Sequence, residues 1–161
     1  MIKNEATINE PHINDLRDAI EHRATWFYFL TKAANERGLN LDDYAREAIY
    51  NCGAFHGMVK FPEGEDLKAF HDAFATENVK KIFEWDVDLQ EDELNVTFNY
   101  CPLVKAWQKL TDDEKLIDHM CDIAMDGDRG IVAKYDTFEF DLGDTIAKGC
   151  PSCKLTIRKK K

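Results

Sequence analysis

Four of the five cysteines fall in the second half of the chain, in settings where a thiol can bind a metal ion or react. Cys101 precedes Pro102 at the end of an expected strand, Cys121 lies in an expected helix, and Cys150 and Cys153 form a Cys-x-x-Cys pair. This spacing lets a tight turn present two sulfur atoms to one zinc ion, or a redox dithiol to a partner. We therefore place the functional site within residues 101–153.

A carboxylate extends the set of candidate ligands. Asp118, Cys121 and Asp122 are three and four residues apart, which puts their side chains on one face of a helix. Asp118 and Cys121, together with Cys150 and Cys153, would complete a tetrahedral zinc site. The alternative is that the thiols are only buried, because free cysteine is among the most buried residue types. The sequence leaves both interpretations open, and zinc is the only cofactor that it suggests.

Among the histidines, His56 is the best placed for a ligand. It follows Gly53 and precedes Gly57, and two glycines permit close approach to a bound molecule. A histidine packed in the core is the alternative interpretation. The sequence contains no Ser-His-Asp order, phosphate loop or dinucleotide fingerprint.

The elements that must position these residues begin with helices. Apolar residues recur at steps of three and four in the first part of the chain. Helices are expected over residues 11–38, 41–58 and 65–76. In the second of them, Cys52, Gly53 and Gly57 are small enough to allow close packing against another helix. Six aromatic residues of the first two helices are expected to serve as core or as one wall of a pocket: Trp26, Phe27, Tyr28, Phe29, Tyr50 and Phe55.

The apolar period changes to two from residue 80 onward. Residues 80–89 and 94–100 alternate apolar and polar side chains, and the acidic link between them predicts a β-hairpin. A short helix is expected to begin at Pro102, and a second one at the capping box formed by Thr111 and Glu114. The segment 126–130 is expected to end that helix. Two further strands fit residues 137–141 and 155–158.

The resulting order, ααα-ββ-αα-ββ, predicts an α+β fold in which an N-terminal helical layer packs on a mostly antiparallel sheet. A chain of 161 residues has the usual length of one domain. We expect a single domain, 1–161, with a helical part at 1–78 and a cysteine-bearing α+β part at 79–161.

The composition of the chain argues against some classes of binding partner. The net charge of −10 argues against binding to nucleic acid through phosphate neutralisation. No apolar stretch reaches the length of a membrane span, and the first residues are too polar for a signal peptide. The expectation is a cytoplasmic protein with reduced thiols and a small-molecule substrate or ligand, without a membrane partner and compatible with a homodimer.

Three runs of residues resemble the L-2-amino-thiazoline-4-carboxylic acid hydrolase family. They are Tyr100-Cys101-Pro102-Leu103-x-x-Ala106-Trp107, then Cys121-Asp122, then Thr145-Ile146-Ala147-x-Gly149-x-x-x-Cys153-x-Leu155. The same plan is similar to the 4-vinyl reductase-like ligand-binding domains, some of which hold zinc through cysteines and a glutamate. Asp118 stands where that plan has glutamate, and Cys150 is an additional sulfur.

The hydrolase resemblance implies the opening of a cyclic amidine to an N-carbamoyl thiol amino acid. Such a reaction needs a base for water, an acid for the leaving group and a binding site for the substrate carboxylate. Asp122 and Asp126 are the candidates for base and acid, and Cys121, on the same helix face as Asp122, is a further candidate catalytic residue. Cys101 is an alternative nucleophile if a positive group or the helix that begins at Pro102 lowers its pKa.

Residues beside these candidates are expected to bind the substrate. They are Tyr100, Lys105 and His56, with Arg129 as a further partner for a carboxylate. The second resemblance implies instead a zinc-containing small-molecule binding or sensor module. The two hypotheses differ in whether the cysteine region carries chemistry or a metal.

Overall fold

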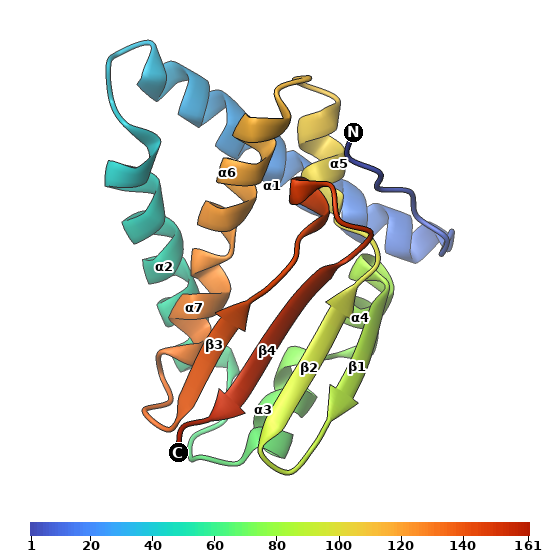
Figure 1. Ribbon diagram of the computed structural model, residues 1–161, viewed down its shortest axis with the longest axis vertical. Helices are drawn as coiled ribbons and strands as arrows, with labels where there is room; N and C mark the ends of the chain where they lie inside the picture. Colours follow the sequence, from blue (N-terminus) through green and yellow to red (C-terminus); the bar gives the residue numbers. More distant parts are fainter.

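Helices cover one face of a four-stranded sheet (Figure 1). The computed structural model describes residues 1–161. The helices are α1 (Pro11–Asn35), α2 (Leu41–Lys60), α3 (Leu67–Phe74), α4 (Glu77–Phe83), α5 (Pro102–Gln108), α6 (Glu114–Ala124), α7 (Asp126–Val132) and the 3-10 helix η1 (Ile146–Lys148). The strands are β1 (Trp85–Leu89), β2 (Glu93–Phe98), β3 (Phe138–Leu142) and β4 (Cys153–Lys159). This arrangement confirms the predicted α+β class.

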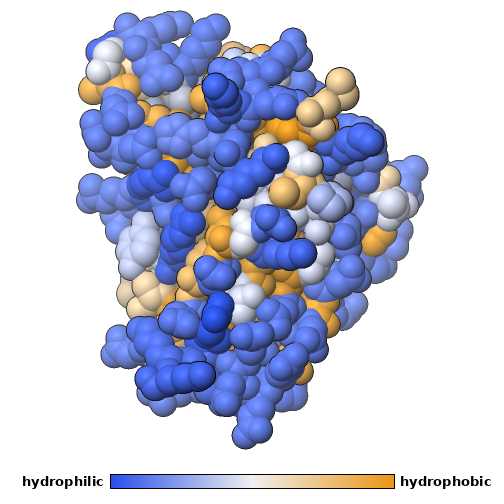
Figure 2. All heavy atoms as spheres, viewed as in Figure 1, coloured by the Kyte–Doolittle hydropathy of each residue, from blue (hydrophilic) through white to orange (hydrophobic).

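The sheet is antiparallel throughout, in the order β1-β2-β4-β3. Alternate residues of β2 and β4 are buried under the helices, among them Val96, Leu155 and Ile157. The residues between them are polar, and Figure 2 shows a mostly hydrophilic surface on the side from which the sheet is viewed. The alternation that predicted the strands therefore follows from a sheet with one face buried and one face in solvent.

One hydrophobic core joins the two parts of the chain. It includes Phe70 from the helical part and Trp107, Ile123 and Leu155 from the later part, all of them almost completely buried. Trp107 also donates a hydrogen bond from its indole nitrogen to the carbonyl of Ala24 in α1. The helices thus pack directly on the cysteine-bearing part.

The helix α4 replaces the first half of the predicted strand 80–89. Thr76 caps it by accepting a hydrogen bond from the Val79 amide, and Glu84 ends it with a left-handed backbone at φ 52°. The Glu84 carboxylate accepts hydrogen bonds from Arg17 of α1 and from the Thr7 amide. These tertiary contacts stabilise a bend between α4 and β1, which the alternation of apolar and polar residues over 80–89 does not predict.

The segment 126–130, expected to end a helix, instead forms most of α7. Glycine is a poor helix former, so tertiary packing supplies the stabilisation. A Cβ atom on Gly130 would overlap the Tyr50 carbonyl, and one on Gly53 would overlap the Gly127 carbonyl. The predicted close packing of α2 through small residues is therefore confirmed, with α7 as the partner helix.

Candidate functional site

A cavity of about 660 Å³ lies between the helices and the sheet. Of the 30 residues that line it, 23 are hydrophobic. The deep wall includes Ala24 and Trp107, which are both 0% exposed, and Leu155 of β4, which is 2% exposed. Its volume and lining are typical of a small-molecule binding site.

The mouth of the cavity lies between α1 and α2. The exposed residues of its lining come from these two helices: Arg23, Trp26, Leu30, Cys52 and Lys60. Trp26 and Phe27 are the two members of the predicted aromatic wall that line it. Figure 1 shows that α1 and α2 diverge from their common end.

Three cysteines lie on the inner wall: Cys101, Cys121 and Cys153. All three are at least 93% buried, whereas Cys52 is at the exposed mouth and Cys150 is half-buried outside the lining. Thiols from three separate segments therefore line this wall. Cys101 immediately precedes α5, Cys121 lies in α6 and Cys153 is the first residue of β4.

These buried thiols are uncharged. Burial raises the pKa of Cys101 to about 11, although the amides of Val104 and Leu103 at the start of α5 donate hydrogen bonds to its sulfur and favour the thiolate. Burial also raises the pKa of Cys153 to about 12 and that of Cys121 well above its usual value. The condition set for Cys101 as a nucleophile, a lowered pKa, is therefore not met, because desolvation outweighs the favourable amides.

The backbone of Cys101 is held by the N-terminal segment. The Asn4 side chain accepts a hydrogen bond from the Cys101 amide at 2.9 Å and donates one to its carbonyl at 2.8 Å. Both bonds are buried, and Asn4 itself is 3% exposed. Residues at the start of the chain therefore fix one wall of the cavity.

Asp128 is the one acidic residue on the cavity wall. It follows Gly127 in α7, is half-buried and lines the cavity. Burial raises the pKa of Asp128 to about 6, and the charges of Arg23 and Arg129 offset only part of this effect. Arg23 lines the same cavity and acts on the carboxylate through charge alone, without a hydrogen bond. A carboxyl that titrates near neutral pH thus faces an apolar space beside a cation.

His56 also lines the cavity, as a substrate-binding residue would. Its Nδ1 atom is buried and has no hydrogen-bond partner in the protein. It lies one helical turn beyond Gly53, on the helix that packs against α7. An unpaired buried ring nitrogen is unfavourable unless a ligand or water satisfies it.

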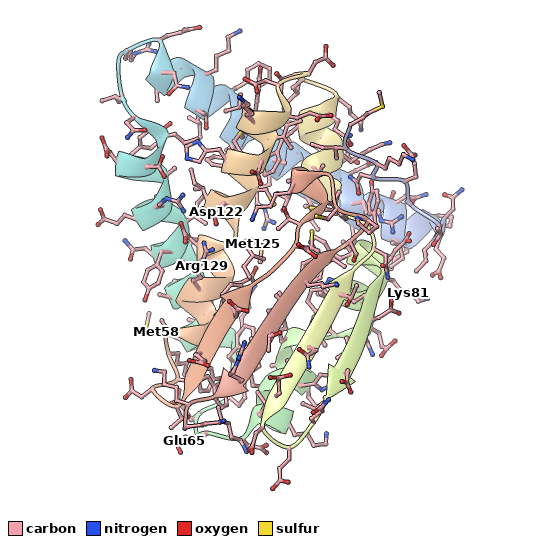
Figure 3. All side chains as sticks on the ribbon, viewed as in Figure 1. Met58, Glu65, Lys81, Asp122, Met125 and Arg129 are labelled. Atoms are coloured by element: carbon pink, nitrogen blue, oxygen red, sulfur yellow. The ribbon has the colours of Figure 1, made fainter.

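Asp122 and Asp126, predicted as base and acid, lie outside the cavity lining in a network with two arginines. Asp122 accepts hydrogen bonds from Arg46 at 2.8 Å and Arg129 at 3.0 Å, and Asp126 from the same arginines at 3.1 and 2.7 Å. Burial tends to raise the pKa of Asp122, but the two arginines outweigh it and lower that pKa. The network connects α2, α6 and α7, and Figure 3 shows Asp122 and Arg129 on neighbouring helices.

The other predicted substrate-binding residues also lie away from the cavity lining. Tyr100 is buried beneath Arg17, whose guanidinium lies 4.5 Å from the ring centroid, and burial raises the Tyr100 pKa to about 12. Lys105 forms an ion pair with Glu5 at 3.2 Å. Both residues have partners within the protein.

No group of three or more histidine, cysteine, aspartate or glutamate side chains in the structure is placed to hold a metal. Asp118 and Cys150 are half-buried and lie outside the cavity lining, whereas Cys121 and Cys153 are inside it. The zinc site of Asp118, Cys121, Cys150 and Cys153 stays a prediction, which metal analysis of protein purified without chelator would test.

Sequence reasoning missed Arg23 and Asp128. Arg23 belongs to no motif in the sequence, and Asp128 lies in the segment 126–130 that was expected to end a helix. One signal was available, because Gly127 and Gly130 are three residues apart and Gly53 and Gly57 are four apart. Such matched small residues are typical of two helices in close contact, and a helix over 126–132 points Asp128 away from the arginine network.

Together the fold and the cavity define an α+β domain that encloses a mostly apolar cavity between helices and an antiparallel sheet. The family model for L-2-amino-thiazoline-4-carboxylic acid hydrolase matches residues 17–157, and the chain belongs to that family. Membership supports a hydrolase-type function. A search of curated proteins gives no match.

A solved structure shares the fold. It is a trafficking protein particle complex subunit 3 from Naegleria fowleri, covalently bound to palmitic acid, with a TM-score of 0.57 and 14% identity. The match covers 88% of this chain and 95% of that one. At this identity the likeness concerns the fold alone. No helix of the present chain is long and apolar enough to cross a membrane.

Proposed function

We propose that the chain hydrolyses a small cyclic amidine, with 2-amino-thiazoline-4-carboxylate as the reference substrate, inside the cavity. The observation that carries this proposal is the Asp128 carboxyl, which faces the cavity beside Arg23 without a hydrogen-bond partner. A pKa of about 6 suits a group that must accept and then return a proton near neutral pH.

The proposed reaction begins with the attack of water on the amidine carbon, C2. Asp128 accepts a proton from the water and passes it to the ring nitrogen N3. The tetrahedral carbon then forms a C=O bond as the C2–S bond breaks, and Asp128 accepts the hydroxyl proton. The sulfur receives the proton held by Asp128, and the product is an N-carbamoyl thiol amino acid. One water molecule is consumed, and the carboxylate ends in its starting form.

Arg23 is the proposed partner of the substrate carboxylate. It stands at the mouth of the cavity, so the ring would point inward toward Asp128. His56 would hydrogen-bond the substrate through its unpaired Nδ1 atom. The apolar wall strengthens these polar interactions, because charges attract more strongly where water is excluded.

The state of the thiols favours attack by water over attack by cysteine. With a pKa of about 11, Cys101 is almost entirely protonated at neutral pH and is a weak nucleophile. The three inner cysteines then act as apolar wall residues, which matches their burial. No step of the proposed reaction requires a metal ion.

The test compares two carboxylates of the same region. Purified protein is incubated with 2-amino-thiazoline-4-carboxylate, and the N-carbamoyl product is measured by mass spectrometry. We expect Asp128→Asn to reduce kcat/KM about a hundredfold or more, the typical contribution of a general base. Asp122→Asn is the matched control and should retain most of the activity. Full activity in Asp128→Asn would overturn the assignment of the base.

A further inference from the structure

We infer that the natural ligand of the cavity is an elongated amphipathic carboxylate, with its anionic head at the mouth and an apolar chain directed toward the sheet. The inference rests on the proposed function only for its site, since binding of such a molecule requires no hydrolysis. It names the substrate class that the cavity would accept.

The first argument is size. At roughly 30 Å³ for each non-hydrogen atom, by analogy with water in the liquid, a cavity of about 660 Å³ has room for about twenty atoms. The reference thiazoline has about nine, so it would leave more than half of the space unfilled. A ligand that fills the cavity carries about a dozen further atoms.

The second argument is the chemistry of the inner wall. Its side chains come from all layers of the fold and are almost entirely apolar, including Phe74 of α3, Phe83 of α4, Phe98 of β2 and Leu155 of β4. The inner cysteines are uncharged and offer only weak hydrogen bonds. A ligand part placed here gains by leaving water and has few polar partners to meet, as an alkyl or aryl chain would.

The third argument is the charge at the mouth. Arg23 and Lys60 are the two cationic residues of the lining, and both are exposed where the cavity opens. Their charges stand out in a chain with a net charge of −10. A carboxylate is therefore favoured at the mouth, whereas the same group at the inner wall would lose its hydration without a partner.

The three tryptophans of the chain provide the measurement. Trp26, Trp85 and Trp107 all line the cavity, so a bound bromoalkyl chain should quench their fluorescence. The probes are 4-bromobutanoate, 8-bromooctanoate and 12-bromododecanoate below their micelle concentrations. We expect saturable quenching and an affinity that rises roughly three- to fourfold for each added methylene until the cavity is full. Absence of saturable quenching by 12-bromododecanoate, or equal affinity for all three acids, would overturn the inference.

A charge variant tests the orientation of the ligand. Arg23→Gln, at an exposed position, should weaken 12-bromododecanoate binding about tenfold and leave 12-bromododecanol binding unchanged. Lys32→Gln is the matched control, because Lys32 is exposed on the same helix outside the lining. An equal loss for acid and alcohol would overturn the placement of the carboxylate at Arg23.

The two proposals fail separately. If the bromoacids do not bind while the thiazoline is hydrolysed, the ligand class is wrong and the proposed reaction stands. If they bind with the expected chain-length dependence while no cyclic amidine is hydrolysed, the reaction is wrong and the ligand class stands.

Discussion

Two sets of carboxylates lie within seven residues of sequence but in opposite environments. Asp122 and Asp126 share two arginines, and these hold the pKa of Asp122 below its usual value. Asp128 faces an apolar cavity, and burial raises its pKa to about 6. The comparison shows that the surroundings of a carboxylate, more than its place in a motif, determine whether it stabilises the fold or is available for proton transfer.

The pH dependence of turnover is expected to distinguish Asp128 from the pair Asp122 and Asp126 more strongly than any other measurement. If ionised Asp128 is the base, kcat/KM should fall about tenfold for each pH unit below 6 and level off above it. The profile should keep this midpoint in Asp122→Asn. Initial rates measured from about pH 3.5 to pH 8 would check this, and a midpoint near pH 4 would indicate that another carboxylate is the base.

The contact between α2 and α7 positions both sets, so its disruption should affect both. Gly130→Ala would force a methyl group against the Tyr50 carbonyl, and we expect a loss of about 1–3 kcal/mol in the free energy of unfolding. Gly127→Ala is the matched control on the same helix, because its Cβ atom would meet only Ile49 at 3.6 Å. Urea unfolding of both variants would test this, and equal stability would show that the helices can separate without cost.

Stability should respond in opposite directions when each carboxylate is removed. For Asp128 the folded pKa is raised, so its contribution to stability is complete below the unfolded value of 3.8 and is lost as the pH rises through about 6. For Asp122 the folded pKa is lowered, so its contribution is present above 3.8 and is lost as the pH falls through the lowered value.

At pH 7, Asp128→Asn should therefore raise the free energy of unfolding and Asp122→Asn should lower it, each by about 1 kcal/mol. The Tm should change in the same direction in each variant. Thermal unfolding followed by circular dichroism would measure both changes. A decrease of the Tm in Asp128→Asn would mean that the carboxylate has a stabilising partner.

The smallest effect concerns the inner thiols. Cys101→Ala removes a protonated wall residue, so we expect kcat to change by no more than about threefold. Steady-state kinetics on the reference thiazoline would measure it. A loss of a hundredfold in a variant that remains folded would identify Cys101 as the nucleophile and remove water from that role.

Local patterns predicted much of the fold. The hairpin of β1 and β2, the helix α6 and the last two strands follow from periodicity, which depends on neighbouring residues. The predicted capping box of Thr111 and Glu114 is wrong, because Asp113 caps α6 by accepting hydrogen bonds from the Lys115 and Leu116 amides.

Local patterns did not predict the helices α4 and α7, because contacts with distant residues stabilise them. Arg17 holds Glu84 at the end of α4, and Tyr50 of α2 packs against Gly130 of α7.

The candidate site was predicted less completely for the same reason. Cys101, Cys121 and His56 were found because their residue types are distinctive, and all three line the cavity. Arg23 and Asp128 have common residue types, and they become candidate site residues only because α1 and α7 pack around one cavity. Their detection requires knowledge of which surfaces enclose a cavity.

The strand order has a consequence for how the cavity arises during synthesis. β4, the last strand along the chain, lies between β2 and β3 and supplies Cys153 and Leu155 to the inner wall. A ribosome that has released residues up to 142 has therefore produced a hairpin and a separate strand that cannot yet pair with each other. The cavity becomes able to retain a ligand only after β4 has joined them, so a nascent chain should gain its ligand in one late step.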